Sequence, residues 1–138
     1  MAFSNEQINR LQSSFSFLKP RLGLVADHFE QALLESTPAM SVHFPMDRVS
    51  FELNMLLICG HAADLDLLGD RFAEMGEDLG DLGITSERFP AAKAAMLQAF
   101  AAISGYTWTQ SLQSDWETLF DTVGASAFVA ESSIRQAA

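Results

Sequence analysis

Apolar residues recur at spacings of three and four along most of this chain, and no stretch alternates apolar and polar residues over more than a few positions. Spacings of three and four place side chains on one face of an α-helix, whereas strict alternation would indicate a β-strand. The four prolines and eight glycines fall mostly where a helix would begin or end. The pattern therefore predicts an all-α protein without strands.

The first helices are predicted from their capping residues and apolar faces. Ser4-Asn5-Glu6-Gln7 is a capping-box sequence, in which the serine and glutamine side chains satisfy backbone N–H groups. We expect a first helix from this box to Pro20, a second that ends before Pro38, and a third that runs toward Ala63. Their apolar faces are Ile8, Leu11, Phe15 and Leu18; Leu22, Val25, Phe29, Ala32 and Leu33; and Val49, Leu53, Leu56 and Leu57.

The fourth predicted helix is short, because it runs into a glycine-rich stretch. It is expected over residues 65–75 and broken by the glycines at 76, 80 and 83, since each glycine costs about 1 kcal/mol of helix stability relative to alanine. The acidic stretch over residues 74–81 lacks the spacing of a calcium-binding loop, and we expect it to be a solvated, loosely helical segment.

Two longer helices are expected in the last third of the chain. The fifth begins at Ser86 or a near neighbour, with Pro90 in its first turn, and ends at Gly105, which suits a C-cap. Thr107-Trp108-Thr109-Gln110 offers a second capping box, after which a long final helix is expected. The buried faces are predicted to be Met96, Phe100 and Ile103, and Leu112, Trp116, Leu119, Val123 and Ala127.

Composition limits the class of protein. A length of 138 residues suits one domain, and 49% hydrophobic residues suffice for a packed core. The net charge of −10 repels phosphate backbones and anionic lipid headgroups, so neither a nucleic-acid nor a membrane partner is expected. Residues 1–6 lack the features of an export signal, and the single cysteine, Cys59, excludes an intramolecular disulfide. We therefore expect a cytoplasmic protein.

Several segments, in order along the chain, resemble bacterial globins. Residues 28–38, running to Phe44-Pro45, resemble the B–C region of the single-domain globins and of the haem domains of flavohaemoglobins. Residues 83–90 are similar to that family's turn into the G helix, and Thr107-Trp108-Thr109 followed by Trp116 is similar to the start of its H helix. The resemblance covers nearly the whole chain. It implies one globin domain over residues 1–138, with helices A, B, C, E, F, G and H in a three-over-three arrangement.

The resemblance also locates the haem pocket, and there the chain departs from the family. The family's proximal histidine falls on Leu79, its distal tyrosine on Glu30, and its distal glutamine or histidine on or near Phe51. The tyrosine after the F–G turn is Phe89. By this resemblance the pocket-lining positions are Glu30, Phe44, Phe51, Met55, Leu79 and Phe89.

Haem ligation of the family's kind is not expected, although the family binds O₂ or NO through haem. The iron requires an imidazole on the F helix. The histidines of this chain are His28, His43 and His61, so the F and G helices contain none. Phe44, similar to the haem-packing phenylalanine at the C–D corner, is retained while the ligand positions are replaced. We accordingly predict no cofactor and no metal site.

Other iron ligands are conceivable but have simpler explanations. His43 precedes Phe44 and could approach a pocket from the distal side, yet a histidine at a bend is more often a surface residue. Cys59 lies in an apolar run, where cysteine usually behaves as a small hydrophobic residue. Methionines near the pocket, Met55 among them, more often fill gaps in helical cores. Glu30 is expected either to face solvent or to project into the pocket.

Three functions are compatible with the sequence, and none is enzymatic, because no catalytic constellation or phosphate loop is present. The first is a binding or sensing module, whose pocket holds a small apolar molecule or is filled by its own side chains. The second is a haem protein with an unusual iron ligand. The third is a homodimerisation unit formed through the G and H helices, which requires Trp108 and Trp116 to be exposed.

Overall fold

The computed structural model describes residues 3–39, 47–61, 69–81 and 84–128. Within these ranges the regular structure is helical and no strand occurs, so the all-α prediction is confirmed for them. The elements are α1 (Asn5–Leu18), η1 (Lys19–Arg21), α2 (Leu22–Ser36), α3 (Arg48–Cys59), α4 (Gly69–Asp81), α5 (Phe89–Ser104), η4 (Gly105–Thr107) and α6 (Gln110–Ala127).

The first helices begin and end close to their predicted limits. The capping box at the start of α1 is confirmed: Ser4 Oγ accepts from the Gln7 N–H at 3.2 Å, and the Ser4 N–H donates to Gln7 Oε1 at 2.9 Å. Pro20 lies in η1, which leads directly into α2. Asp47 caps α3, because its Oδ1 accepts from the Val49 N–H at 3.0 Å. Side chains near the helix starts therefore set these limits.

The predicted limits of the last two helices need correction. α5 begins at Phe89, three residues after Ser86. The predictions of Pro90 in its first turn and of Gly105 as its C-cap are confirmed, and the φ of +59° at Gly105 favours glycine. The capping box predicted at Thr107 is wrong. Thr107 belongs to η4 and its hydroxyl donates to the Ser104 carbonyl, while Thr109 caps α6 by accepting from the Leu112 N–H at 3.1 Å.

The prediction that glycines break the fourth helix is also wrong. α4 continues through Gly76 and Gly80 as far as Asp81, and the predicted start near residue 65 lies outside the described residues. A Cβ atom at Gly76 would overlap the carbonyl oxygen of Ala127 at the end of α6. Glycine at this position therefore allows the two backbones to meet, and the contact with α6 offsets the weak helix propensity.

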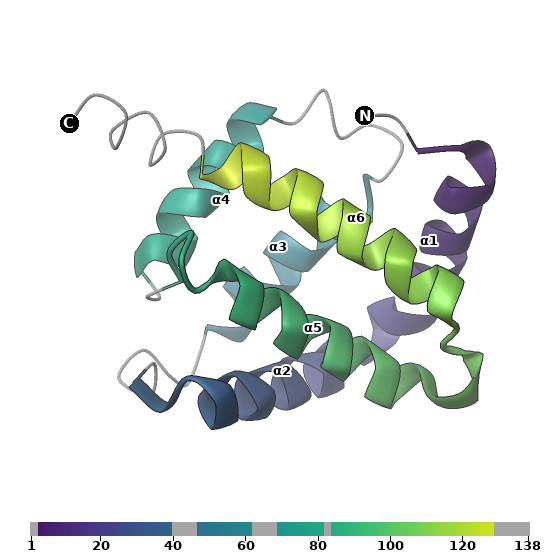
Figure 1. Cartoon of the computed structure of the whole chain (residues 1–138), viewed down its shortest axis with the longest axis horizontal. Helices are drawn as coiled ribbons and strands as arrows, with labels where there is room; N and C mark the ends of the chain where they lie inside the picture. The colour runs from purple at the N-terminus through teal and green to yellow at the C-terminus, as the bar shows by residue number, and fades with distance from the viewer. Residues whose placement is uncertain (1–2, 40–46, 62–68, 82–83, 129–138) are drawn as a thin grey trace.

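The helices pack in pairs that are distant in sequence. α2 lies beside α5, and α4 lies beside the C-terminal part of α6 (Figure 1). α1 packs against the N-terminal part of α6, and α3 contacts α2. The buried side chains of all these helices form one hydrophobic cluster.

The centre of the core is an aromatic group on α5 and α6. The Phe100 and Trp116 rings meet edge to face at 4.9 Å, and Phe120 contacts both rings at 5.8 and 5.9 Å. The indole N–H of Trp116 donates to Ser14 Oγ at 3.1 Å, so this buried donor is satisfied. The predicted buried face of α6 is confirmed at Leu112, Trp116, Leu119, Val123 and Ala127.

An ion pair that sequence reasoning missed joins α1 to α6. Asp115 is 3% exposed, and its two carboxylate oxygens accept from the guanidinium of Arg10. Gln7 adds a longer hydrogen bond at 3.4 Å. The hydrogen bond to Asp115 raises the pKa of Arg10 above its ordinary value. A buried carboxylate requires such partners, so this pair positions α1 against α6.

The predicted apolar face of α3 is wrong in part. Val49 and Leu53 are 66% and 60% exposed, whereas Phe51, Met55 and Ile58 are buried. Both sets have helical spacing, and the neighbouring helices decide which set faces the core.

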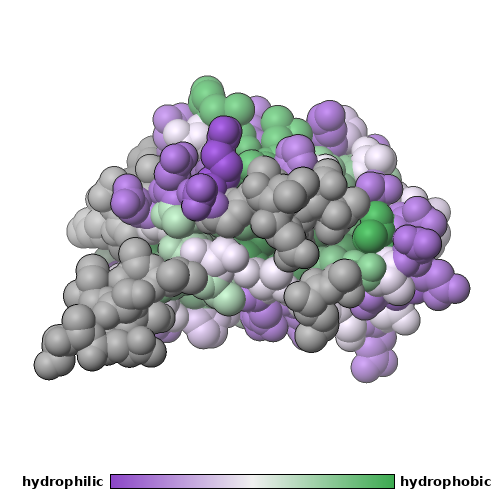
Figure 2. All heavy atoms as spheres, turned by 90° about the horizontal axis from the view of Figure 1, so that it is seen from above, coloured by the Kyte–Doolittle hydropathy of each residue, from purple (hydrophilic) through white to green (hydrophobic). Residues whose placement is uncertain are grey.

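Hydrophobic side chains also reach the surface elsewhere. Large exposed examples are Phe17, Leu24 and Tyr106. On the face shown in Figure 2, hydrophilic side chains separate the hydrophobic areas from one another. Within the part of the chain that the structure describes, no helix has the length and apolar character needed to cross a bilayer.

Candidate functional site

A cavity of about 290 Å³ lies among α3, α4, α5 and α6. Its walls are mainly apolar. Four phenylalanines and three methionines from different helices contribute most of the bulky side chains. They are Phe29, Phe51, Phe89 and Phe120, and Met55, Met75 and Met96.

Four of the residues predicted to line a pocket do line this cavity. Phe51 and Met55 come from α3, where their spacing of four places them on one face. Leu79 comes from the C-terminal half of α4, and Phe89 is the first residue of α5. Residues separated by almost forty positions thus meet at one cavity.

Glu30 does not line the cavity, although it was predicted among the pocket positions. Its side chain is 14% exposed, and Oε2 accepts from the Arg48 guanidinium at 3.3 Å. Arg48 also donates to Asp27 Oδ1 at 2.6 Å, so it links the start of α3 to α2. Glu30 therefore faces neither open solvent nor the cavity. Phe44, the remaining predicted position, lies outside the described residues.

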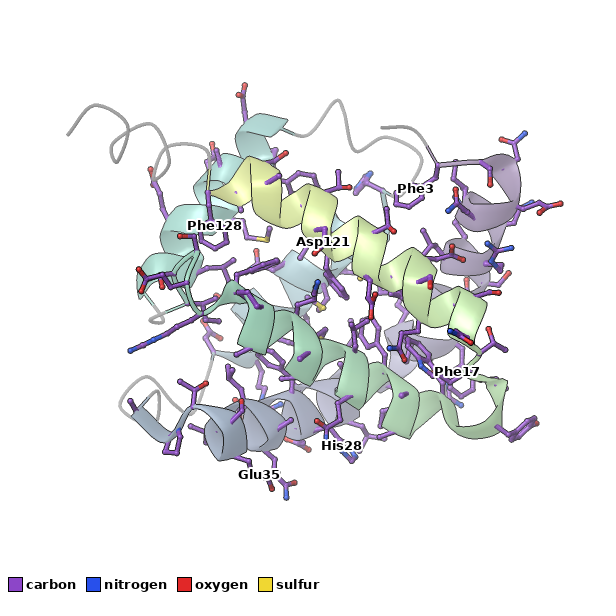
Figure 3. The ribbon with its side chains drawn as sticks, in the orientation of Figure 1. Phe3, Phe17, His28, Glu35, Asp121 and Phe128 are labelled. Carbon is purple, nitrogen blue, oxygen red and sulfur yellow. The ribbon has the colours of Figure 1, made fainter. Side chains whose placement is uncertain are left out.

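A glycine on α6 determines where the Phe89 ring lies. A Cβ atom at Gly124 would come within 2.5 Å of the Phe89 ring. The Phe89 ring also packs edge to face against the Phe128 ring, with 5.4 Å between the ring centroids. Phe128 lies at the end of α6, beside α4 (Figure 3). Gly124 therefore leaves the space that the Phe89 ring occupies at the cavity wall.

Two further contacts shape the wall. The centroids of the Phe29 and Phe51 rings lie 5.9 Å apart, and this contact joins α2 to α3 at the cavity wall. The carbonyl of Leu79 accepts from the Ile84 N–H at 2.8 Å, and the Ile84 side chain lines the cavity. Both contacts place apolar groups around the space.

The polar residues that line the cavity were not predicted: Asp47, Ser50, Asn54 and Lys93. Asp47, Ser50 and Asn54 share a face of the α3 region at spacings of three and four, which the sequence could have indicated. Lys93 comes from α5, and its Nζ lies 2.8 Å from Oδ1 of Asp121 on α6.

The other candidate ligands of the sequence lie away from the cavity or outside the described residues. His28 and His61 are exposed and do not line the cavity, and His28 projects from α2, away from α4 (Figure 3). His43 lies outside the described residues. Cys59 is buried but is not a lining residue, and burial raises the pKa of its thiol above the ordinary value. The thiol is therefore protonated rather than a metal-binding thiolate.

The residues around the cavity do not fit haem as the family holds it. Haem iron is bound by histidine, cysteine thiolate, tyrosine, or methionine together with histidine. The described lining residues include no imidazole or thiolate, and Tyr106 is almost fully exposed elsewhere. Their sulfur atoms are thioethers. Nor do the described ranges contain a group of three or more histidine, cysteine, aspartate or glutamate side chains placed to hold a metal ion.

No protein-family model matches this chain, and no curated protein is found to be similar to it. The likeness to globins therefore stays a prediction from the sequence motifs. The chemistry of the cavity is the remaining basis for a functional proposal.

Proposed function

We propose that this chain is a globin-like binding or sensing module that takes a small apolar molecule, not haem, into the cavity among α3, α4, α5 and α6. One observation carries the proposal. Phe51, Met55, Leu79 and Phe89, the positions that the resemblance assigns to a haem pocket, line a cavity of about 290 Å³, and the lining residues that the structure describes include no imidazole. Among the described residues, the cavity walls are mainly apolar and lack the ligand that haem requires.

The arrangement of the helices supports the globin part of the proposal. By the resemblance, α3, α4, α5 and α6 correspond to helices E, F, G and H, and the family's haem lies between E and F. The cavity lies beside α3 and α4, which agrees with that place. Globins surround their pocket with helices packed in pairs. The packing of α2 on α5 and of α4 on α6 is consistent with such an architecture.

The size of the cavity supports a bound molecule over a pocket filled by its own side chains. Protein interiors contain few voids larger than a water molecule. A volume of about 290 Å³ is near the lower end of the range for small-molecule sites, about 300–1,000 Å³. Such sites are mostly apolar with a few polar groups, as this one is.

The alternative functions receive less support. A haem held by thioethers would depend on Met55, Met75 and Met96 without a histidine partner among the described lining residues. Dimerisation through α5 and α6 was expected to expose two tryptophans, but Trp116 is fully buried and Trp108 is half-buried. We therefore propose a non-enzymatic binding role.

Methionine methyl NMR tests the proposal, because Met55, Met75 and Met96 line the cavity. Toluene is expected to shift their signals saturably. Ala92→Leu, which adds volume at a buried lining position, should abolish these shifts while the protein stays folded. The matched control is Ala94→Leu, at an exposed position of the same helix, and should bind toluene normally.

Two outcomes would contradict the proposal. In one, toluene produces no saturable shifts in the parent protein. In the other, haemin gives a Soret band well away from that of free haemin, with one haem per chain. That result would favour a haem protein with an unusual ligand.

A further inference from the structure

The polar groups of the cavity are confined to a small part of its lining. Asp47, Ser50 and Asn54 follow one another along one face of the α3 region, and Lys93 faces the cavity from α5. The other lining residues in the described part of the chain are apolar. A molecule in the cavity therefore meets hydrocarbon, sulfur and aromatic rings over most of its surface and polar groups over a small part.

Three of these four polar residues already have partners. The two carboxylate oxygens of Asp47 accept from the Val49 N–H and from the Ser50 hydroxyl, both at 3.0 Å. Lys93 forms its ion pair with Asp121. Both charged groups and the serine hydroxyl are thus committed to contacts within the protein.

Asn54 differs from the other three. Its side chain is half-buried and lines the cavity, and it makes no hydrogen bond to any residue in the described part of the chain. A carboxamide has two donor hydrogens and a carbonyl acceptor. Asn54 therefore has both kinds of hydrogen-bonding capacity available to a bound molecule.

The charges near the cavity favour an uncharged molecule. An anionic group would approach Asp47 and Asp121 in a protein of net charge −10, and Lys93 is already paired. A cationic group would lose its hydration against described walls that are mostly apolar, and the lining carboxylate, Asp47, lies at the start of α3 with both oxygens already accepting hydrogen bonds. A charge left without a close partner in a partly buried site is costly, whereas a neutral polar group needs one hydrogen bond.

We infer that the cavity takes an uncharged molecule that is apolar except for one hydroxyl or carbonyl group, which is hydrogen-bonded to the side chain of Asn54. The inference rests on the proposed function, because it names the class of ligand for the same cavity. If each non-hydrogen atom takes about the volume of a water, ~30 Å³, the molecule has roughly ten of them.

A matched series of ligands tests this inference. Propylbenzene, phenylpropanol, phenylpropanoate and phenylpropylamine share one apolar body and differ in the terminal group. At pH 7 we expect phenylpropanol to bind most tightly, about tenfold more tightly than either charged compound. It should also shift the side-chain amide proton signals of Asn54, which propylbenzene should leave nearly unchanged.

Substitution of Asn54 gives an independent measurement. In Asn54→Leu the affinity for phenylpropanol should fall about fivefold to tenfold, as expected for one lost hydrogen bond, while propylbenzene binds as well as before. Asn9→Leu, at an exposed position of α1, is the matched control and should leave both affinities unchanged. If Asn54→Leu does not fold, the amide proton shifts in the parent protein still decide.

The failures can be told apart. If propylbenzene and phenylpropanol both fail to bind, the proposed function is wrong. If propylbenzene binds but phenylpropanol gains nothing over it and does not shift the Asn54 amide signals, the proposed function stands and this inference is overturned. Tighter binding of either charged compound than of phenylpropanol would also overturn it.

Discussion

The core around Trp116 is filled, whereas the core between α3 and α4 contains a cavity. Trp116 contacts two phenylalanine rings and satisfies its N–H through Ser14, and the neighbouring Asp115 is held by Arg10. On the other side, Phe51 and Leu79 border a space of about 290 Å³. α6 contributes to both regions, because Phe120 contacts Trp116 and also lines the cavity.

This difference indicates that two parts of one small core have different roles, one in stability and one in ligand binding. Close packing contributes most to stability where rings and aliphatic groups touch on every side. A side chain at a void lacks partner atoms on that side and contributes less. The region around Trp116 is therefore expected to stabilise the fold, and the region of Phe51 to provide space for a ligand.

The sharpest test of this comparison uses the same substitution in both regions. Phe100→Ala, beside Trp116, should lower the free energy of unfolding by about 3–5 kcal/mol, the usual cost of removing a fully buried ring. Phe51→Ala, at the cavity, should lower the free energy of unfolding by only about 1–2 kcal/mol, because one side of its ring faces the cavity and has fewer contacts to lose. Urea unfolding of both variants, with comparison of their m-values, measures the difference.

The outcome for Phe51 decides the comparison. An equal loss of stability in the two variants would mean that the cavity wall supports the fold as much as the filled region does. Added toluene should raise the stability of the parent protein, since a ligand that binds the folded state stabilises it.

Local sequence pattern predicted the helices well but not every face. The buried face of α6 follows from its periodicity, and the capping box of α1 follows from Ser4 and Gln7. On α3 two apolar sets compete, and the position of α2, whose Phe29 ring packs against Phe51, favours Phe51 inside and Val49 outside. The continuation of α4 through Gly76 likewise depends on Ala127, fifty-one residues later in the chain.

The candidate site was predicted in part for a different reason. Leu79 and Phe89 came from the resemblance to globins and not from any local pattern. The partner of Glu30 is Arg48, on another helix, and this ion pair could not be read from the neighbours of Glu30 in sequence. Asn54 was missed because the spacing of Asp47, Ser50 and Asn54 shows only a shared helix face, and that face is informative only when the cavity beside it is known.

The second prediction concerns how tightly α4 is held against α6. Gly76→Ala should lower the free energy of unfolding by about 1–3 kcal/mol, because its Cβ would overlap the Ala127 backbone and force the helices apart. Gly23→Ala on α2 is the matched control. No atom lies within 4 Å of the Cβ it would add, so it should raise stability by about 0.5–1 kcal/mol.

The separation of α4 from α6 should also alter the cavity, because Leu79 lies on α4 and Val123 on α6. Toluene affinity measured on both glycine variants would sharpen the comparison. A stable Gly76→Ala protein with unchanged affinity would mean that the contact at Gly76 is neither tight nor coupled to the cavity.

The smallest effect is expected for Cys59, which is buried on α3 next to the lining residue Ile58. Burial raises the pKa of its thiol, so above the ordinary value of about 8.5 the unfolded chain releases a proton that the folded chain retains. The unfolded state then binds fewer protons than the folded state, and stability must fall as the pH rises.

The pH dependence therefore reports whether the cavity side stays closed to water. Between pH 8 and 10, the free energy of unfolding of the parent protein should fall relative to that of Cys59→Ala, with a slope approaching about 1.4 kcal/mol per pH unit above the ordinary thiol pKa. Urea unfolding at several pH values measures the slope in each protein. All other titratable groups are common to both proteins, so their contributions cancel in the difference. Parallel curves would mean that water reaches the thiol in the folded state. The region around the cavity would then open to water in the folded protein. It would differ from the region around Trp116 both in how closely its side chains pack and in how much it moves.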